Sequence, residues 1–286
     1  MSFPKVWFIT GASSGFGRVA TETILKEGHI VVATARTPES LNDLTATYSA
    51  DRLLILRVDV TKLQDIIDAF TKVKEVYGRL DVVFNNAGSG ALGELEGTPD
   101  EVARAMFETN FWGAANVSRE AVKFFRDVNK PGIGGRLLNM SSGAGLVPLP
   151  CFGFYCATKH ALEGLTQSLA HELDPEWNIK VTLIEPGDFR TRAHYQSLVR
   201  LEAPPAYRNP SLPSKAIRDA ENSDVLHGSD PRKAVKKIYE LASLPDPPLR
   251  FIVGKDCIEL IKGQLKVIQG DLERYESWSN DLGFDE

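Results

Sequence analysis

The sequence predicts an α/β protein in which a single doubly wound, parallel β-sheet is covered by helices on both faces. Short apolar runs alternate with longer segments of helical periodicity from the first residues to about residue 190. Several runs are apolar at nearly every position, which is typical of strands buried on both faces of a parallel sheet. A glycine-rich turn also stands directly between the first run and the first helical segment. Together these observations favour a Rossmann-type fold.

The expected strands follow apolar runs at residues 6–9, 30–33, 53–58, 82–84, 137–140 and 181–184. Helices are expected between them, because the intervening segments change to helical spacing. Residues 61–77, for example, carry Ile66, Phe70 and Val73 at intervals of three and four. Another helix begins at Tyr155 and continues through Leu173. This alternation predicts βαβ crossovers.

The segment from about residue 190 to residue 230 breaks the alternation. It contains four prolines, few apolar runs and scattered charge. A long irregular insertion in a compact domain is usually a functional lid or a flexible loop, and we expect a lid here. Helices at 231–242 and 257–275 follow, with a short strand at 249–253 between them. No linker divides the sequence, so we expect one domain over residues 1–286 with a helical extension at about 257–280.

Composition excludes several classes of protein. The 286 residues carry a net charge of -5, with a pI near 5.7, so there is no basic surplus for a nucleic-acid partner. The three cysteines are odd in number and fit neither a disulfide framework nor a zinc site, so no metal is expected. Neither a signal peptide nor a membrane-length apolar stretch is visible. We therefore expect a reduced, cytoplasmic protein without a membrane partner.

The glycine-rich turn spans residues 10–17 and has the spacing G-x-x-x-G-x-G. Glycines let the main chain turn tightly and approach a bulky anion, while the next helix directs its N-terminal amides at that anion. Such a turn can also be only a tight loop, but its place after the first strand favours a dinucleotide pyrophosphate. The residues expected to contact this phosphate are Gly11, Ser13, Ser14, Gly15, Phe16 and Gly17.

The end of the second strand indicates which dinucleotide binds. An NAD site needs an acidic side chain there to accept from the ribose 2′-hydroxyl. Ala35 holds that place, and Arg36 follows it. A guanidinium can bind a 2′-phosphate through two hydrogen bonds, so the pair predicts NADP (NADPH), although Arg36 in isolation could equally be a solvated surface residue.

At this point the sequence resembles the short-chain dehydrogenase/reductase superfamily. The resemblance covers about residues 4–190 and rests on five motifs in the family's order. They are the turn at residues 10–17, Asp59-Val60, Asn85-Asn86-Ala87-Gly88, Ser142 with Tyr155-x-x-x-Lys159, and Pro186-Gly187 with Thr191. Any one of them could be accidental, whereas their joint order is not explained by local turns.

The resemblance implies positions for the remaining cofactor contacts. It places Asp59 and Val60 at the adenine ring. It places Asn86, Ala87 and Gly88 beside the adenosine ribose. The nicotinamide and its carboxamide would be flanked by Pro186, Gly187, Phe189 and Thr191, and its ribose would be held by Tyr155 and Lys159.

A separate chemical argument supports Tyr155 and Lys159. Residues four apart lie on one face of a helix. An ammonium about 5 Å away, at an effective dielectric constant of about 20, favours the phenolate by roughly 3 kcal/mol, or about two pKa units. That would bring the Tyr155 pKa toward working pH, where a general acid/base is most effective. The pair could also be an ordinary helix face, but Ser142 lies thirteen residues upstream, at the family's spacing.

The resemblance implies an oxidoreductase in which Tyr155 exchanges a proton with a carbonyl or alcohol oxygen. Ser142 would hydrogen-bond that oxygen, with Ser141 as a rival for the role. Asn110 matches the family's fourth catalytic residue and would hold a water that links Lys159 to solvent. His194 is expected in the lid, where it could touch substrate.

The substrate is expected to be a lipophilic ketone, aldehyde or alcohol, because the side chains available to line the pocket are apolar or aromatic. They are Leu92, Leu146, Val147, Leu149, Phe152, Phe189 and Tyr195. The family also implies a homodimer or homotetramer, which the C-terminal helix could block or extend. Two alternatives stay open: an NADP(H)-sensing regulator without turnover, and a scaffold with an incidental cleft.

Overall fold

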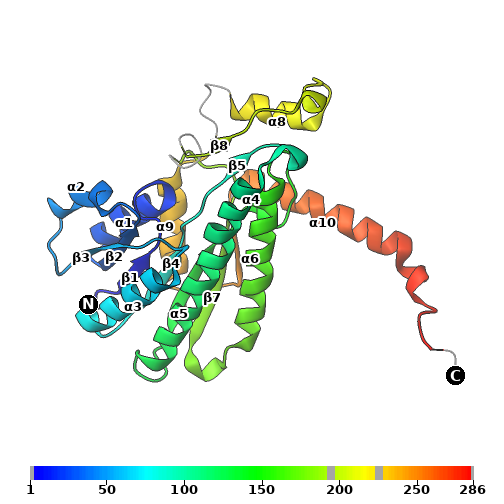
Figure 1. Cartoon of the computed structure of the whole chain (residues 1–286). Helices are drawn as coiled ribbons and strands as arrows, with labels where there is room; N and C mark the ends of the chain where they lie inside the picture. The colour runs from blue at the N-terminus through cyan, green and yellow to red at the C-terminus, as the bar shows by residue number, and fades with distance from the viewer. Residues whose placement is uncertain (1–2, 192–196, 223–227, 285–286) are drawn as a thin grey trace.

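The computed structural model describes residues 3–191, 197–222 and 228–284. His194 and Tyr195, both expected in the lid, lie outside the described residues. In the described part, seven parallel strands form the central sheet in the order β3-β2-β1-β4-β6-β7-β9 (Figure 1). The strands are β1 (Val6–Ile9), β2 (Ile30–Ala35), β3 (Leu53–Arg57), β4 (Val82–Asn85), β6 (Gly135–Met140), β7 (Ile179–Pro186) and β9 (Arg250–Val253).

Helices cover both faces of this sheet, as the sequence predicts. The longer helices are α1 (Gly15–Lys26), α3 (Leu63–Tyr77), α4 (Asp100–Phe107), α5 (Ala114–Asp127), α6 (Gly153–Glu172), α8 (Pro213–Glu221), α9 (Pro231–Leu241) and α10 (Lys255–Tyr275), and α2 (Asn42–Thr45) is a single turn. Apolar side chains of α1 and α9 pack on one face, and those of α3 and α5 pack on the other. The doubly wound fold is therefore confirmed.

The strand order reverses between β1 and β4, which lie side by side although β2 and β3 separate them in the chain. In open α/β sheets a ligand binds outside the carboxyl ends of the strands at such a point. The glycine-rich turn follows β1, and the Asn85–Gly88 motif continues from the end of β4. The fold thus brings two motifs of the sequence together at its expected binding edge.

A buried polar network fixes α6 against the middle of the sheet. The Asn85 side-chain amide of β4 donates to Asn139 Oδ1 of β6 over 3.0 Å. The Asn139 amide donates in turn to Thr166 Oγ1 of α6 over 3.0 Å. Because unpaired amides are costly in a buried layer, this chain of bonds favours one position of α6.

The stretch expected to be irregular contains regular structure. Its strand β8 (Val199–Arg200) pairs in parallel with β5 (Ala91–Leu92) as a small second sheet, and α8 follows. Two-residue strands leave no periodicity in the sequence, and their pairing joins segments that are far apart in the chain. The described residues of this segment are therefore less irregular than the sequence predicts.

The core of the sheet gives a first test. Phe8 of β1 is fully buried, and its ring centroid lies 4.7 Å from that of Phe70 of α3. Phe8→Ala leaves a cavity, and we expect the free energy of unfolding to fall by about 3–5 kcal/mol. Phe3→Ala is the control, because Phe3 is exposed. A loss below about 1 kcal/mol for Phe8→Ala in denaturant titration would contradict this packing.

Candidate active site

The turn between β1 and α1 has no room for side chains at its glycines. Gly11 and Gly15 have φ angles of 65° and 52°, in the left-handed region that favours glycine. A Cβ on Gly17 would lie 2.3 Å from the Gly11 carbonyl oxygen and 2.6 Å from Asn86 Nδ2. The three glycines are therefore required for the close approach of this turn to the end of β4.

Asn86 and Thr10 join the two sides of the reversal point. Thr10 Oγ1 accepts hydrogen bonds from the main-chain amides of Asn86 and Ala87, at 2.8 and 2.9 Å. Asn86 Nδ2 donates to the Thr10 carbonyl oxygen over 3.0 Å. In this structure the Asn85–Gly88 motif holds the glycine turn in place.

The N-terminus of α1 opens into a pocket. Ser13, Ser14 and Gly15 line it together with Thr191, so the structure brings four predicted phosphate and nicotinamide contacts to one place. Phe189 lies beside the same turn, with its ring edge-on to Phe16 at 5.3 Å between centroids. Five further lining residues were not predicted from the sequence: Arg18, Val19, Ser40, Arg190 and Pro231.

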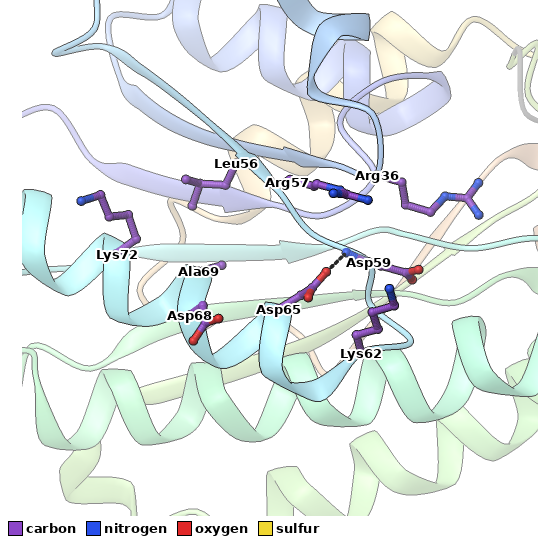
Figure 2. A pocket seen from close by; sticks show the side chains of 9 residues that line it. All are labelled: Arg36, Leu56, Arg57, Asp59, Lys62, Asp65, Asp68, Ala69 and Lys72. Carbon is purple, nitrogen blue, oxygen red and sulfur yellow. Dashed lines mark hydrogen bonds between the residues drawn. The ribbon is translucent and has the colours of Figure 1, made fainter.

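A second pocket lies between β3 and α3 and reaches Arg36, which follows β2 (Figure 2). Arg36 and Asp59 line it, as expected, and Ala35 is buried beside them. Arg57 and Lys62 also line it, and they were missed; the signal for them is a basic residue on either side of Asp59. The residues lining this pocket are Arg36, Leu56, Arg57, Asp59, Lys62, Asp65, Asp68, Ala69 and Lys72.

Charge and hydrogen bonding keep Asp59 ionised in this pocket. Partial burial acts to raise its pKa, but hydrogen bonds from Thr61 and the nearby Arg36 outweigh it, so the pKa is lowered. Val60 is buried, and a Cβ on Gly113 would lie 2.9 Å from its side chain. Asp59 is the half-buried member of the motif and lines the pocket.

Tyr155 and Lys159 lie one turn apart on α6, as the spacing predicts. Lys159 is buried, and its Nζ donates to the Met140 carbonyl oxygen at the end of β6 over 2.8 Å. The same Nζ lies 5.8 Å from the centroid of the Tyr155 ring. Burial lowers the pKa of Lys159 to about 8, and the Glu163 carboxylate opposes that shift.

The direction of the Tyr155 pKa differs from the expectation. Burial raises this pKa, although hydrogen bonding with the Ser142 side chain acts to lower it. Spacing along a helix reveals the neighbouring cation, but it does not reveal how far both groups are removed from water. The expected lowering by Lys159 is therefore wrong for the chain itself, because desolvation dominates.

The structure separates the two candidate serines. Ser142 lies beside Tyr155, and its Oγ accepts from the Ala144 amide over 3.2 Å. Ser141 Oγ is buried on the other side of the loop: a Cβ on Gly145 would lie 2.7 Å from it and 3.2 Å from Glu163 Oε1. Ser142 is thus the serine placed to share an oxygen with Tyr155.

Asn110 lies in the π-helical segment Glu108–Gly113, and its side chain is already occupied. Its Oδ1 accepts from the Ser89 amide over 2.8 Å, and its Nδ2 donates to the Ser89 carbonyl and to Thr158 Oγ1. A Cβ on Gly88 would lie 3.4 Å from Asn110 Oδ1 and 3.9 Å from Lys159 Nζ. Asn110 and Lys159 therefore both lie beside Gly88, and the Asn110 side chain fixes the loop that follows β4.

A buried ion cluster stands one turn below Lys159. Arg250 Nη1 of β9 donates to Glu163 Oε2 of α6 and to Glu185 Oε1 of β7, each over 2.5 Å. Both carboxyls are buried and share this one guanidinium. Burial and the charge of Glu163 raise the pKa of Glu185 to about 7. The sequence analysis did not identify this cluster, because its members are on three different elements.

Another buried ion pair holds the described part of the lid. Arg218 of α8 forms a two-point pair with Glu94, which follows β5. Arg218 Nη1 also donates to the Leu201 carbonyl oxygen over 2.6 Å. A Cβ on Gly90 would lie 3.1 Å from Leu198 of the lid and 3.8 Å from the Tyr155 ring. The lid therefore reaches the neighbourhood of Tyr155.

The first turn of α10 supports two loops of the site. A Cβ on Gly187 would lie 2.2 Å from Asp256 Oδ2, and one on Gly143 would lie 2.7 Å from Cys257 Sγ. Val147 packs with Cys257 and Ile261 in this small cluster. Leu92 is also fully buried.

Two absences hold for the described residues. They contain no group of three or more His, Cys, Asp or Glu side chains that could bind a metal ion. None of their helices has both the length and the apolarity that crossing a bilayer requires.

Comparison with known proteins gives consistent matches. Residues 5–198 match the family model of the short chain dehydrogenases. An uncharacterized oxidoreductase of Schizosaccharomyces pombe, C162.03, is 36% identical over 279 residues, which cover 97% of this chain and 91% of that protein. A 3-ketodihydrosphingosine reductase of Bacteroides thetaiotaomicron is 34% identical, with 88% of each chain covered.

Solved structures agree with these matches. A short-chain dehydrogenase from Streptomyces avermitilis superposes with a TM-score of 0.89 at 34% identity, covering 99% of this chain and 100% of that one. The structure of ElxO with NADP bound gives a TM-score of 0.69 at 26% identity, covering 88% and 96%. The fold is thus shared with a short-chain dehydrogenase and with a protein whose structure holds NADP.

The ion cluster makes stability depend on pH. An unfolded glutamate releases its proton near pH 4.5, whereas folded Glu185 retains its proton until about pH 7. The folded state then binds more protons between these values, so stability falls as pH rises through that window. We expect Glu185→Gln to flatten this fall, measured as the free energy of unfolding by urea at pH 5, 6, 7 and 8. The control is Glu176→Gln, at an exposed carboxyl; equal slopes in both variants would contradict the assignment.

Proposed function

The chain belongs to the short-chain dehydrogenase family and is an oxidoreductase acting on alcohol or carbonyl groups, and we propose that it interconverts lipophilic carbonyls and alcohols with NADP(H). One observation carries the proposal: Ser142, Tyr155 and Lys159 lie together at the carboxyl edge of the sheet, beside the glycine turn. A regulator that only senses the cofactor has no need of a buried lysine next to a tyrosine and a serine.

The residues present fit a nicotinamide dinucleotide. The turn at Gly11, Gly15 and Gly17 offers bare main chain at a helix N-terminus, where a pyrophosphate is stabilised. Gly88 leaves space beside Lys159, which suits a ribose. When bound, this cofactor supplies or accepts the hydride. Pro186 ends β7 and Gly187, Phe189 and Thr191 follow it; these four residues are proposed to hold the nicotinamide end of the cofactor.

In the reducing direction, Tyr155 donates the proton that the carbonyl oxygen needs as it becomes an alcohol. A raised Tyr155 pKa keeps the phenol protonated at neutral pH, which suits the role of acid. Ser142 donates a hydrogen bond to the same oxygen and stabilises the negative charge that develops there. Lys159, with a pKa of about 8, is charged at neutral pH and stabilises the tyrosinate that remains after transfer.

NADP rather than NAD is favoured by the charges at the adenine end. Ala35 provides no carboxylate for a ribose 2′-hydroxyl, and Arg36 and Arg57 line the pocket beside it. Two guanidiniums can bind a phosphate dianion through charge-assisted hydrogen bonds. Arg57 is thus added to Arg36 as a proposed contact of the 2′-phosphate.

The lid favours a lipophilic substrate. Leu198 of the lid lies beside Gly90, which also adjoins the Tyr155 ring, and Leu95, which follows β5, lies beside Gly153 at the start of α6. An apolar wall at this point suits a hydrocarbon chain or ring next to the reacting carbonyl. The relative named as a 3-ketodihydrosphingosine reductase is consistent with a carbonyl on a long apolar molecule.

The proposed mechanism is tested by Tyr155→Phe, which removes only the proton donor. We expect kcat/KM for NADPH-dependent reduction of a panel of hydrophobic ketones and aldehydes to fall at least about a hundredfold, with NADPH binding retained. Tyr77→Phe, at the end of α3, is the matched control. Unchanged turnover in Tyr155→Phe would refute the mechanism, and binding of NADPH without turnover by the wild type would favour the regulator.

Cofactor preference is tested by Arg36→Ala. A charge-assisted bond to phosphate contributes about 1.5–3 kcal/mol, so we expect the Kd for NADPH to rise about ten- to a hundredfold. The Kd for NADH should stay the same, because NADH lacks the 2′-phosphate. Calorimetric titration measures both, with Arg119→Ala as an exposed control. An unchanged NADPH preference would remove Arg36 from the site.

A further inference from the structure

The C-terminal helix α10 leaves the body of the protein after its first two turns (Figure 1). Cys257 and Ile261 are buried and pack with Val147. From residue 265 to residue 284 every described residue is exposed. The exposed stretch is nevertheless rich in large apolar side chains, namely Leu265, Val267, Ile268, Leu272, Tyr275, Trp278, Leu282 and Phe284.

These apolar residues follow a heptad pattern. Ile258, Ile261, Leu265, Ile268, Leu272 and Tyr275 are separated by three, four, three, four and three residues. That alternation places them at successive a and d positions of a coiled coil. Beyond Ile261 the seam is open to solvent, with Leu265 59% exposed, Ile268 47% and Leu272 67%. A 3.5-residue apolar repeat is typical of packing against another helix.

The helix also lacks the means to be stable without a partner. Gly263 and Gly270 lie inside it, and each lowers helix stability by about 1 kcal/mol relative to alanine. Isolated helices shorter than about 12–15 residues are marginal in water, and the free part of α10 is of this length. Among the described residues, none covers the seam beyond Ile261. Its stability therefore requires packing against another chain.

We propose that α10 pairs with α10 of a second copy of this chain, antiparallel and about a two-fold axis, as a two-stranded coiled coil. A single seam used on both subunits satisfies the self-complementarity that a two-fold interface requires. In the register that uses only exposed layers, Leu265 packs against the partner's Tyr275, and Ile268 packs against the partner's Leu272. Each contact occurs twice by symmetry.

Charge decides between the two orientations. In the antiparallel pair, Lys262 at an e position lies near the partner's Glu276, which directly follows the last residue of α10, and this attraction occurs twice. In a parallel pair, Asp271 at a g position would lie near the partner's Glu276, and this repulsion would occur twice. In the antiparallel form, Asp271 of each subunit faces Asp271 of the partner subunit near the two-fold axis, and this repulsion occurs only once. The balance of charges favours the antiparallel orientation.

Disulfide cross-linking tests the orientation in the intact protein. The three native cysteines are buried, so Leu265→Cys and Tyr275→Cys each add one reactive thiol. We expect each variant alone to stay uncross-linked on mild oxidation, and the mixture of the two to form a covalent dimer. A dimer from either variant alone indicates the parallel form, and no dimer from the mixture excludes this seam; both results overturn the proposal.

The mass in solution is the second test. Leu265→Glu places a charge in the seam, and we expect light scattering to show half the wild-type mass. Val267→Glu is the matched control, because Val267 is equally exposed, at 59%, but lies off the seam. An unchanged mass for Leu265→Glu, or an equal loss in Val267→Glu, would overturn the proposal. Thermal unfolding confirms that both variants fold.

Discussion

The constraint on which the rest of the structure depends is that all seven strands of the central sheet run in one direction. Each loop after a strand therefore emerges at the same edge. The glycine turn follows β1, Arg36 follows β2, Asp59 follows β3, and Ser142 follows β6. Residues spread over most of the chain thus become neighbours because the strands are parallel, and not because these residues bind one another. The reversal between β1 and β4 then opens the space that these neighbours surround.

The site is assembled from groups that are costly to bury, each held by a specific partner. Lys159 is buried next to the Met140 carbonyl, and two glutamates share Arg250 one turn below it. Removing any one of these charged side chains would leave its partner charged and unpaired in the buried layer. That would destabilise the fold strongly. Lys159 and Glu163, four residues apart, thus lie on the same side of α6.

Sequence reasoning succeeded where a feature is local and failed where it depends on distance in space. Apolar runs identified the sheet strands, and i, i+4 spacing identified Tyr155 and Lys159 as neighbours. The lid helix α8 was missed, because its anchor joins Glu94 to Arg218, 124 residues apart. The direction of the Tyr155 pKa was wrong, because burial is a property of the packed chain. Spacing already favoured Ser142 over Ser141, and the path of the loop places Ser142 beside Tyr155.

The first turn of α10 has a consequence for how far the chain can be shortened. Asp256 and Cys257 occupy the space that side chains at Gly187 and Gly143 would need. Truncation after Ile261 removes only the solvent-exposed part of the helix and leaves both loops supported. Truncation before Lys255 removes that support and opens a gap directly beneath them. The C-terminal segment thus divides near residue 262. The loops at Gly143 and Gly187 require the part before this point and do not require the part after it.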